Sequence, residues 1–79
     1  MKTILDFIHE SDCDNYIIYK NDNTKNVILS FYCGMNIVNT NQHIYDLSIK
    51  NIKASMIEKD IFDRNKNNLI IYLKEDVKT

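Results

Sequence analysis

The sequence predicts an α+β fold in which a short N-terminal helix packs on an antiparallel sheet of about four to six strands. Apolar residues near the N-terminus recur at helical spacing, whereas the later runs are rich in β-branched and aromatic residues and are separated by polar turns. The chain has 79 residues, a length suited to one thin hydrophobic core. We therefore expect residues 1–79 to form a single compact domain.

Residues 2–10 have the pattern of a short amphipathic helix. The apolar residues at helical spacing are Ile4, Leu5, Phe7 and Ile8. Asp6 and Glu10 fall on the other side of the same helix. A helix of this length is marginal in water on its own. We therefore expect Phe7 and Ile8 to anchor it on the sheet.

The next part of the chain has the composition of short strands. The predicted strands are residues 16–20, 26–32, 35–38 and 69–73. The polar residues 21–25 lie between the first two strands and predict a hairpin. Cys33-Gly34 predicts a turn before the third strand, and residues 39–42 predict a polar loop after it.

Residues 44–62 fit two different secondary structures. A helix would place four apolar residues on one face, namely Tyr45, Ile49, Ile52 and Met56. Other apolar residues would fall on the opposite side of that helix, namely Leu47, Ala54 and Ile61. As strands, residues 45–50 alternate cleanly, and the alternation changes phase at Asn51, as a bulge or turn requires. Because β-branched Ile recurs, we favour strands and keep a second helix at residues 44–62 as the alternative.

The composition argues against an enzyme. Gly34 is the only glycine, and there is no proline or tryptophan. A loop that cradles phosphate needs several glycines, because the backbone must approach the ligand closely. A domain of this size also has little room for an enclosed substrate pocket. We therefore expect a binding protein that has no cofactor and no catalytic residue.

The charges and cysteines point to an intracellular protein. Ten basic and eleven acidic residues give a net charge of −1, which argues against a polybasic binder of nucleic acid or membranes. Cys13 and Cys33 are too few for a disulfide framework. The first residues lack the apolar core of a signal peptide, and no run is long enough to span a membrane. We expect a cytoplasmic protein, in the producing or infected cell, with reduced cysteines.

The acidic N-terminal part predicts a surface for another protein. Four carboxylates lie close together in the sequence, namely Asp6, Glu10, Asp12 and Asp14. Locally they are unfavourable, because two repel along the helix and two follow its C-terminus. Such a cluster suits a partner rich in lysine and arginine. A basic nucleic-acid-binding protein of a host is the partner class that we expect, and a sheet edge could also permit self-association.

Amino-acid usage indicates the source of the chain. Ile, Asn, Lys and Tyr, whose codons are AT-rich, supply nearly half of the residues. A low-GC origin, small size and the lack of catalytic motifs together suggest a phage or mobile-element protein that inhibits a host protein, including the anti-CRISPR role. This hypothesis does not depend on any motif.

Exposed tyrosines on a sheet give an alternative function, which is binding of single-stranded nucleic acid. The residues that would carry it are Tyr19, Tyr32, Tyr72, Lys20 and Lys25. Aromatic rings stack on unpaired bases and lysines contact phosphates, but no motif of the known RNA-binding sheets accompanies these residues.

Two patterns for metal sites are incomplete. His9, Cys13, Cys33 and His43 offer zinc ligands for a small metal-binding domain, but they lack the close pairing of structural zinc sites. The segment that begins at Asp63 resembles the first half of an EF-hand calcium loop. Its twelfth position, which needs a carboxylate, is Lys74. We therefore predict that the protein binds neither metal.

Overall fold

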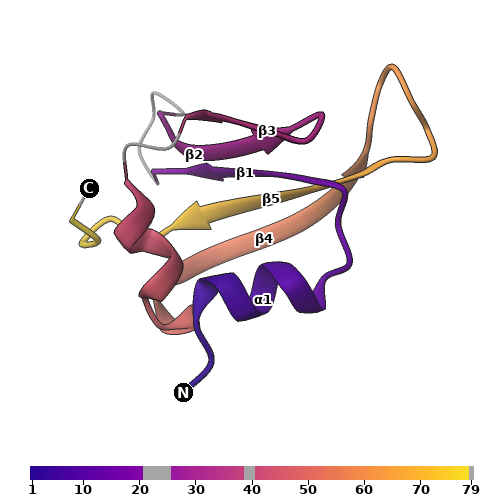
Figure 1. The fold of residues 1–79 in the computed structure, drawn as a ribbon. Helices are drawn as coiled ribbons and strands as arrows, with labels where there is room; N and C mark the ends of the chain where they lie inside the picture. Colours follow the sequence, from indigo (N-terminus) through magenta and orange to yellow (C-terminus); the bar gives the residue numbers. More distant parts are fainter. Residues whose placement is uncertain (21–25, 39–40, 79) are drawn as a thin grey trace.

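The structure is a computed structural model that describes residues 1–20, 26–38 and 41–78. It confirms the α+β class, with one short N-terminal helix packed on a five-stranded sheet (Figure 1). The elements in chain order are α1 (Ile4–Glu10), β1 (Asn15–Tyr19), β2 (Val27–Tyr32), β3 (Met35–Val38), the 3₁₀ turns η1 (Gln42–Asp46) and η2 (Ile49–Asn51), β4 (Ile52–Lys59) and β5 (Asn67–Leu73).

The sheet is mixed, so the prediction of an antiparallel sheet is wrong at one of the four strand pairings. Its strand order is β3-β2-β1-β5-β4. The neighbours pair antiparallel except for β1 and β5, which are parallel. The chain leaves β3, passes through η1 and η2, and lays β4 at the far edge of the sheet. The chain then turns back, so β5 pairs antiparallel with β4 and fills the place between β4 and β1. In this place β5 runs in the same direction as β1.

Helix α1 begins with a capping box. The Thr3 hydroxyl accepts a hydrogen bond from the Asp6 backbone N–H at 3.2 Å, and the Asp6 carboxylate accepts one from the Thr3 N–H at 3.0 Å. Ile4 and Ile8 lie one turn apart and are both buried. The predicted helix is confirmed, although it starts at Ile4. Ile8 anchors it as predicted, whereas Phe7 is only partly buried.

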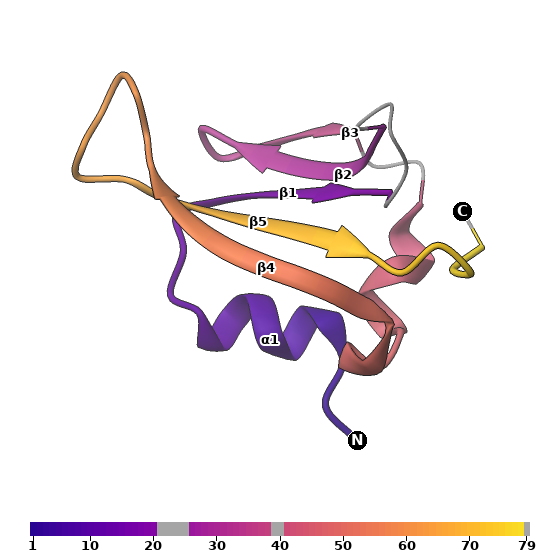
Figure 2. The same cartoon turned by 180° about the vertical axis from the view of Figure 1, so that it is seen from behind.

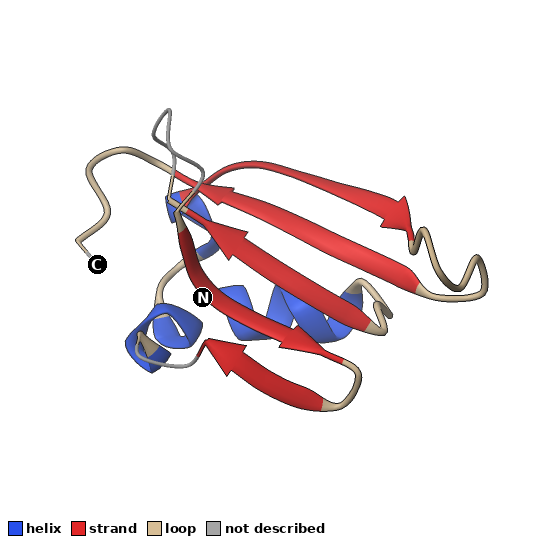
Figure 3. Ribbon diagram, turned by 90° about the horizontal axis from the view of Figure 1, so that it is seen from above, coloured by secondary structure: helices blue, strands red, loops and turns tan. Residues whose placement is uncertain are grey.

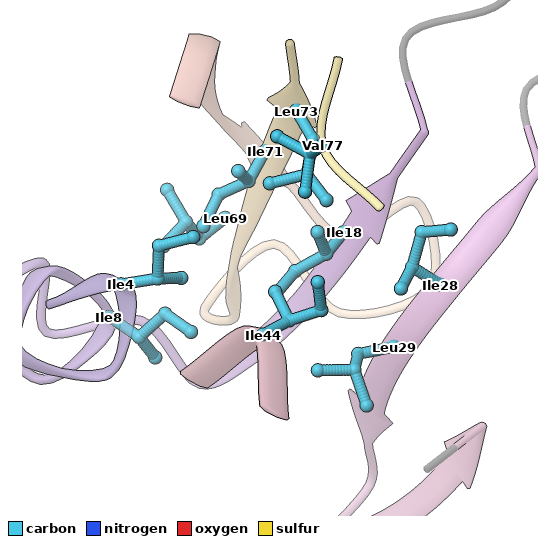
Figure 4. Packing of buried hydrophobic residues seen from close by; sticks show 10 residues of the cluster. All are labelled: Ile4, Ile8, Ile18, Ile28, Leu29, Ile44, Leu69, Ile71, Leu73 and Val77. Carbon is cyan, nitrogen blue, oxygen red and sulfur yellow. The ribbon is translucent and has the colours of Figure 1, made fainter. Parts of the chain in front are cut away.

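One continuous hydrophobic core lies between the sheet and its helical layer (Figure 4). Its buried residues are Ile4, Ile8, Ile18, Ile28, Leu29, Ile44, Leu69, Ile71, Leu73 and Val77. Ile4 comes from α1, and Val77 comes from the segment after β5, so both ends of the chain contribute to the core. These contacts bury the short helix that could not be stable alone.

Residues 45–50 are not a strand, contrary to the prediction, and no α-helix forms at 44–62. Two short 3₁₀ turns occupy this region instead. The N-terminus holds them, because the Ile4 N–H donates to the Leu47 carbonyl at 2.8 Å and the Ile49 N–H to the Lys2 carbonyl at 3.2 Å. The alternating pattern came from side chains that pack on the core through these turns, including Tyr45 and Leu47. The second half, β4, is a strand as predicted.

The predicted hairpins are present. Strands β1 and β2 pair antiparallel, with Tyr16 opposite Phe31. Strands β2 and β3 are joined by the two-residue turn Cys33-Gly34, whose φ angles are 54° and 79°. Two successive positive φ values are typical of a tight hairpin turn, and Gly34 adopts this conformation without strain. The loop predicted at residues 21–25 lies outside the described residues, and so does the first half of the loop predicted at residues 39–42. The 3₁₀ turn η1 begins at Gln42, within that predicted loop.

Candidate functional site

The sheet has a covered face and an open face. In Figure 3 the strands lie in front of α1, so the viewer sees the open face. The central ladder of this face joins like residues of the parallel strands β1 and β5: Asn15 with Asn68, Ile17 with Ile70, and Tyr19 with Tyr72. The Asn15 amide donates to the Asn68 side-chain oxygen at 2.9 Å, and the two tyrosine rings are stacked. The open face is therefore polar at one end and aromatic at the other.

Three connections meet at the polar end, and we call this region the loop end. They are the α1–β1 connection (11–14), the Cys33-Gly34 turn and the β4–β5 loop (60–66). Asp14 accepts a hydrogen bond from the Asn67 N–H at 2.8 Å, and the Asn15 side-chain oxygen accepts one from the Cys33 N–H at 3.1 Å. These bonds fix the connections to one another.

Asp60 organises the β4–β5 loop. It is only 4% exposed, and its carboxylate accepts hydrogen bonds from the Tyr32 hydroxyl and from the backbone N–H groups of Phe62 and Asp63. These bonds, that of Tyr32 first, lower the pKa of Asp60 below its ordinary value. In return, the hydrogen bond to Asp60, followed by burial, raises the pKa of Tyr32 to about 12.

The same loop presents two large apolar side chains to solvent. Ile61 and Phe62 are each 87% exposed, although both neighbour the buried Asp60. The loop projects beyond the sheet in both side views (Figures 1 and 2). The Asp60 N–H donates to the Lys66 carbonyl at 3.0 Å and closes the loop, and the Lys66 N–H donates to the Asp63 carbonyl at 3.0 Å within it. A hydrogen-bonded loop thus holds a phenylalanine away from the core.

A shallow depression of about 470 Å³ lies beside Phe62. Residues from all three connections line it, including Asp14, Gly34, Asp60, Phe62 and Lys66. An adjoining depression of about 390 Å³ is lined in part by His9, Asp12, Cys13 and Asp14. Because Asp14 lines both, the exposed Phe62 and the acidic connection belong to one continuous surface.

Two of the four acidic residues predicted to bind a partner lie at this surface, namely Asp12 and Asp14. Asp6 lies in the capping box of α1, and Glu10 forms an ion pair with Lys2 at 2.6 Å. The premise that these charges have no favourable local contacts is therefore wrong for Asp6, Glu10 and Asp14. Asp12, with a φ of 54°, makes no side-chain hydrogen bond or ion pair within the described residues. Partner binding by the four carboxylates stays a prediction.

The structure brings only part of the alternative nucleic-acid set together. Tyr19 and Tyr72 stack with ring centroids 5.5 Å apart, and Lys20 follows Tyr19 directly. Tyr32 is bound to Asp60 at the loop end. Lys25 lies outside the described residues.

The candidate zinc ligands are dispersed. Cys13 and Cys33 are free thiols, and the His43 ring lies near the C-terminus, 3.3 Å from the Lys78 carbonyl oxygen. Across residues 1–20, 26–38 and 41–78, no group of three or more His, Cys, Asp or Glu side chains is arranged to hold a metal. The segment that begins at Asp63 belongs to the connection between β4 and β5.

The sequence interpretation missed Asp60, Ile61 and Phe62 as site residues. The available signal was an apolar pair placed between charged residues in a polar connection, with Asp at positions 60 and 63. An aspartate carboxylate commonly accepts hydrogen bonds from the backbone N–H groups two or three residues later and so stabilises a turn. That pattern identifies an ordered loop, but it does not tell which side chains the loop exposes.

No protein-family model matches the chain, and neither the curated proteins nor the solved structures gave a match. Among the described residues, no helix has the length and apolar character needed to cross a membrane.

Proposed function

We propose that the protein is a non-catalytic module that binds another protein through the loop end. The observation that carries this proposal is the 87% exposure of Phe62 on a loop fixed by the buried Asp60. Large apolar side chains displayed together at the surface are characteristic of interaction sites. Aromatic residues also provide much of the binding energy at protein interfaces.

The fixed conformation of the loop supports the same function. Binding costs free energy when a flexible loop must become ordered. Here two carboxylates already accept hydrogen bonds from backbone N–H groups of the loop. Asp60 accepts from the Asp63 N–H, and Asp63 accepts from the Asn65 N–H at 3.0 Å. Phe62 can therefore enter a partner's pocket at a small entropic cost.

The charges beside Phe62 favour a basic partner. Asp12 and Asp14 are exposed on the adjoining connection, and Asp63 is partly exposed in the middle of the loop. Arg64 and Lys66 of the same loop offset part of this charge and leave one negative charge in excess. Acidic residues around an apolar centre increase the association rate with a positively charged surface. We infer a basic protein, such as a nucleic-acid-binding protein of a host cell. The amino-acid usage, which indicates a low-GC genome, favours a phage or mobile-element protein that inhibits a host protein, with an anti-CRISPR role as one case.

A capture experiment with a matched control tests the apolar centre. Immobilised parent, Phe62→Ser and Val27→Ser proteins are exposed to nuclease-treated lysate of the source host, and the bound proteins are quantified by mass spectrometry. Val27 is 40% exposed at the start of β2, the opposite end of that strand from Tyr32. We expect a protein that parent and Val27→Ser retain and that Phe62→Ser loses. Equal retention by all three would contradict the loop-end site.

Association kinetics with the captured protein test the charges. The variant Asp12→Asn/Asp14→Asn keeps an acceptor for the Asn67 N–H, whereas Glu75→Gln/Asp76→Asn removes the same charge elsewhere. Exposed charges act over about 8 Å at physiological ionic strength. We expect slower, less salt-dependent association for the first variant only. Equal effects of both variants would show that net charge, and not this surface, controls association.

A further inference from the structure

The aromatic end of the open face lies opposite the loop end and carries a different set of side chains. Parallel strands β1 and β5 both end here, and β4 begins here. Tyr19 and Tyr72 are the last pair of the ladder, both partly exposed. The helical layer with the core residues Ile4, Ile8 and Ile44 lies on the other face, so it does not cover these rings.

The geometry of the tyrosine pair leaves one ring face available. The ring centroids are 5.5 Å apart with an interplanar angle of 19°. Nearly parallel rings this close cannot lie side by side in one plane, so they face each other in an offset stack. One face of Tyr72 is thus turned to Tyr19, and the other is turned to β4.

The residue of β4 opposite Tyr72 is Ala54. Its methyl group is too small to cover an aromatic ring, and Ala54 is itself exposed. The second face of Tyr72 is therefore turned to the space above Ala54 on the edge strand β4, and we call this space the slot. The next open-face residue of β4, Met56, is 46% exposed and extends the apolar floor of this slot. A flat apolar ring of another molecule fits this space.

Three lysines lie at the same end of the sheet as the slot. Lys53 precedes Ala54, Lys74 follows β5, and Lys20 follows Tyr19. Lys53 and Lys74 line one shallow depression, of about 490 Å³, together with Glu75 and Asp76. The three lysines exceed the two carboxylates by one charge. This small excess suits a ligand that combines a flat ring with a phosphate, and it predicts weak binding.

We propose that this end of the open face binds single-stranded nucleic acid, with one unpaired base stacked on Tyr72 above Ala54 and the flanking phosphates near Lys53, Lys74 and Lys20. Stacking on an aromatic side chain accepts any base, and lysine contacts with phosphate carry no sequence information. Binding is therefore sequence-independent and sensitive to salt. This site is separate from the loop end and does not depend on the proposed protein partner.

Fluorescence anisotropy with a labelled oligouridylate of about 12 nucleotides tests the site at low salt. We expect a dissociation constant in the range of tens to hundreds of micromolar that rises with salt. Tyr72→Ala should weaken binding about five- to a hundredfold, whereas Tyr72→Phe should keep it. Lys53→Gln should weaken binding and reduce the salt dependence, and Lys66→Gln at the loop end should do neither.

Filling the slot provides a test that removes no group from the protein. Ala54→Leu should cover the free face of Tyr72 and weaken binding, whereas Ser55→Leu, on the other face of β4, should not. Phe62→Ser should leave oligonucleotide binding unchanged, which separates this proposal from the protein-binding site. No detectable binding at low salt would overturn the proposal. Binding that heparin displaces and that neither Tyr72→Ala nor Ala54→Leu alters would also overturn it, because it would be purely electrostatic.

Discussion

The Tyr32 hydroxyl donates a hydrogen bond to the Asp60 carboxylate, although two strands, β1 and β5, separate β2 from β4 in the sheet. The bond ties the end of β2 to the residue that follows β4. Asp60 in turn holds the backbone N–H of Phe62 at 2.7 Å. The position of an exposed side chain at the candidate site is thus linked to a hydroxyl on a distant strand.

Tyr32→Phe should lower the melting temperature by several degrees, because it leaves the buried Asp60 carboxylate without one of its donors. Tyr19→Phe, at the other end of the sheet, is the control and should have little effect. Thermal melts of both variants at neutral pH provide the measurement. Equal melting temperatures for the parent and Tyr32→Phe would show that the bond does not stabilise the loop.

The same bond makes stability depend on alkaline pH. Folding raises the pKa of Tyr32 from its ordinary value of 10.0 to about 12, so the fold favours the protonated phenol. This contribution is complete below pH 10 and is lost as the pH rises toward about 12. We expect the parent to lose stability across this range more steeply than Tyr32→Phe does. Parallel curves of melting temperature against pH would contradict this prediction.

A further prediction concerns the capping box at the start of α1. Thr3→Ala removes the side-chain acceptor for the Asp6 N–H and should cost about 0.5–2 kcal/mol of unfolding free energy. Asp12→Asn is the control, because Asn tolerates the positive φ at that position. Urea unfolding of both variants checks the difference. If Asp12→Asn is the more harmful, the capping box does not stabilise the helix.

Acid should weaken the same box. Hydrogen bonds from Thr3 lower the pKa of Asp6 below its ordinary value of 3.8. The stabilising effect is therefore present above that value and is lost as the pH falls through the lowered pKa. Asp60 follows the same rule, because its pKa is also lowered. Replacing Asp6, Glu10, Asp12 and Asp14 together by Asn or Gln should therefore reduce the free energy of unfolding. The main reason is that the capping box loses the Asp6 carboxylate.

The sequence predicted those parts of the fold that depend on local periodicity. The helix at α1, the β1–β2 hairpin, the Cys33-Gly34 turn and most of β5 have local signals in their apolar spacing and turn residues. The parallel pairing of β1 with β5 has no such signal, because strand order depends on the path that the chain takes around the core. The prediction of an antiparallel sheet failed at this one pairing for that reason.

The segment from η1 to η2 and the candidate site were missed for related reasons. Alternation at residues 45–50 indicated a strand. In the structure this segment instead forms backbone hydrogen bonds with Lys2 and Ile4, including the 2.8 Å bond from the Ile4 N–H to the Leu47 carbonyl. The large apolar side chain of Phe62 alone would predict that this residue is buried in the core. Its exposure follows from the bonds of Asp60 to a tyrosine far along the sequence, which single-sequence patterns do not reveal.

Core packing predicts a difference between two neighbours on α1. Ile8 is 4% exposed, whereas Phe7 is only partly buried. Ile8→Ala should cost about 2–5 kcal/mol, a large part of the stability of a small domain. Phe7→Ala should cost less, despite the larger side chain that it removes. Denaturant unfolding of both variants tests this order, and the reverse order would place Phe7 at the centre of the helix contact.

The Cys33-Gly34 turn allows a stabilising substitution. Cys33 adopts a φ of 54°, which Asn tolerates better than Cys, and Asn-Gly is a favoured sequence for such hairpin turns. Cys33→Asn should therefore raise the melting temperature slightly. Gly34→Ala should cost about 1–2 kcal/mol, because its φ of 79° strains any side chain even though no atom lies within 4 Å of the added Cβ. Equal stability of the two variants would show that turn conformation does not limit this hairpin.

Calcium should leave the protein unchanged. The loop that resembles an EF-hand begins at Asp63, but Lys74, in the position that needs a bidentate carboxylate, follows the far end of β5. The nearby oxygens are already in use, because Asp63 accepts from the Asn65 N–H and Asp60 from Phe62 and Tyr32. A calcium ion would have to displace these bonds without gaining the missing ligand. The melting temperature should therefore be the same in millimolar calcium as in the presence of a chelator. Micromolar calcium binding in calorimetry that Asp63→Ala abolishes would instead show that the loop rearranges around the ion.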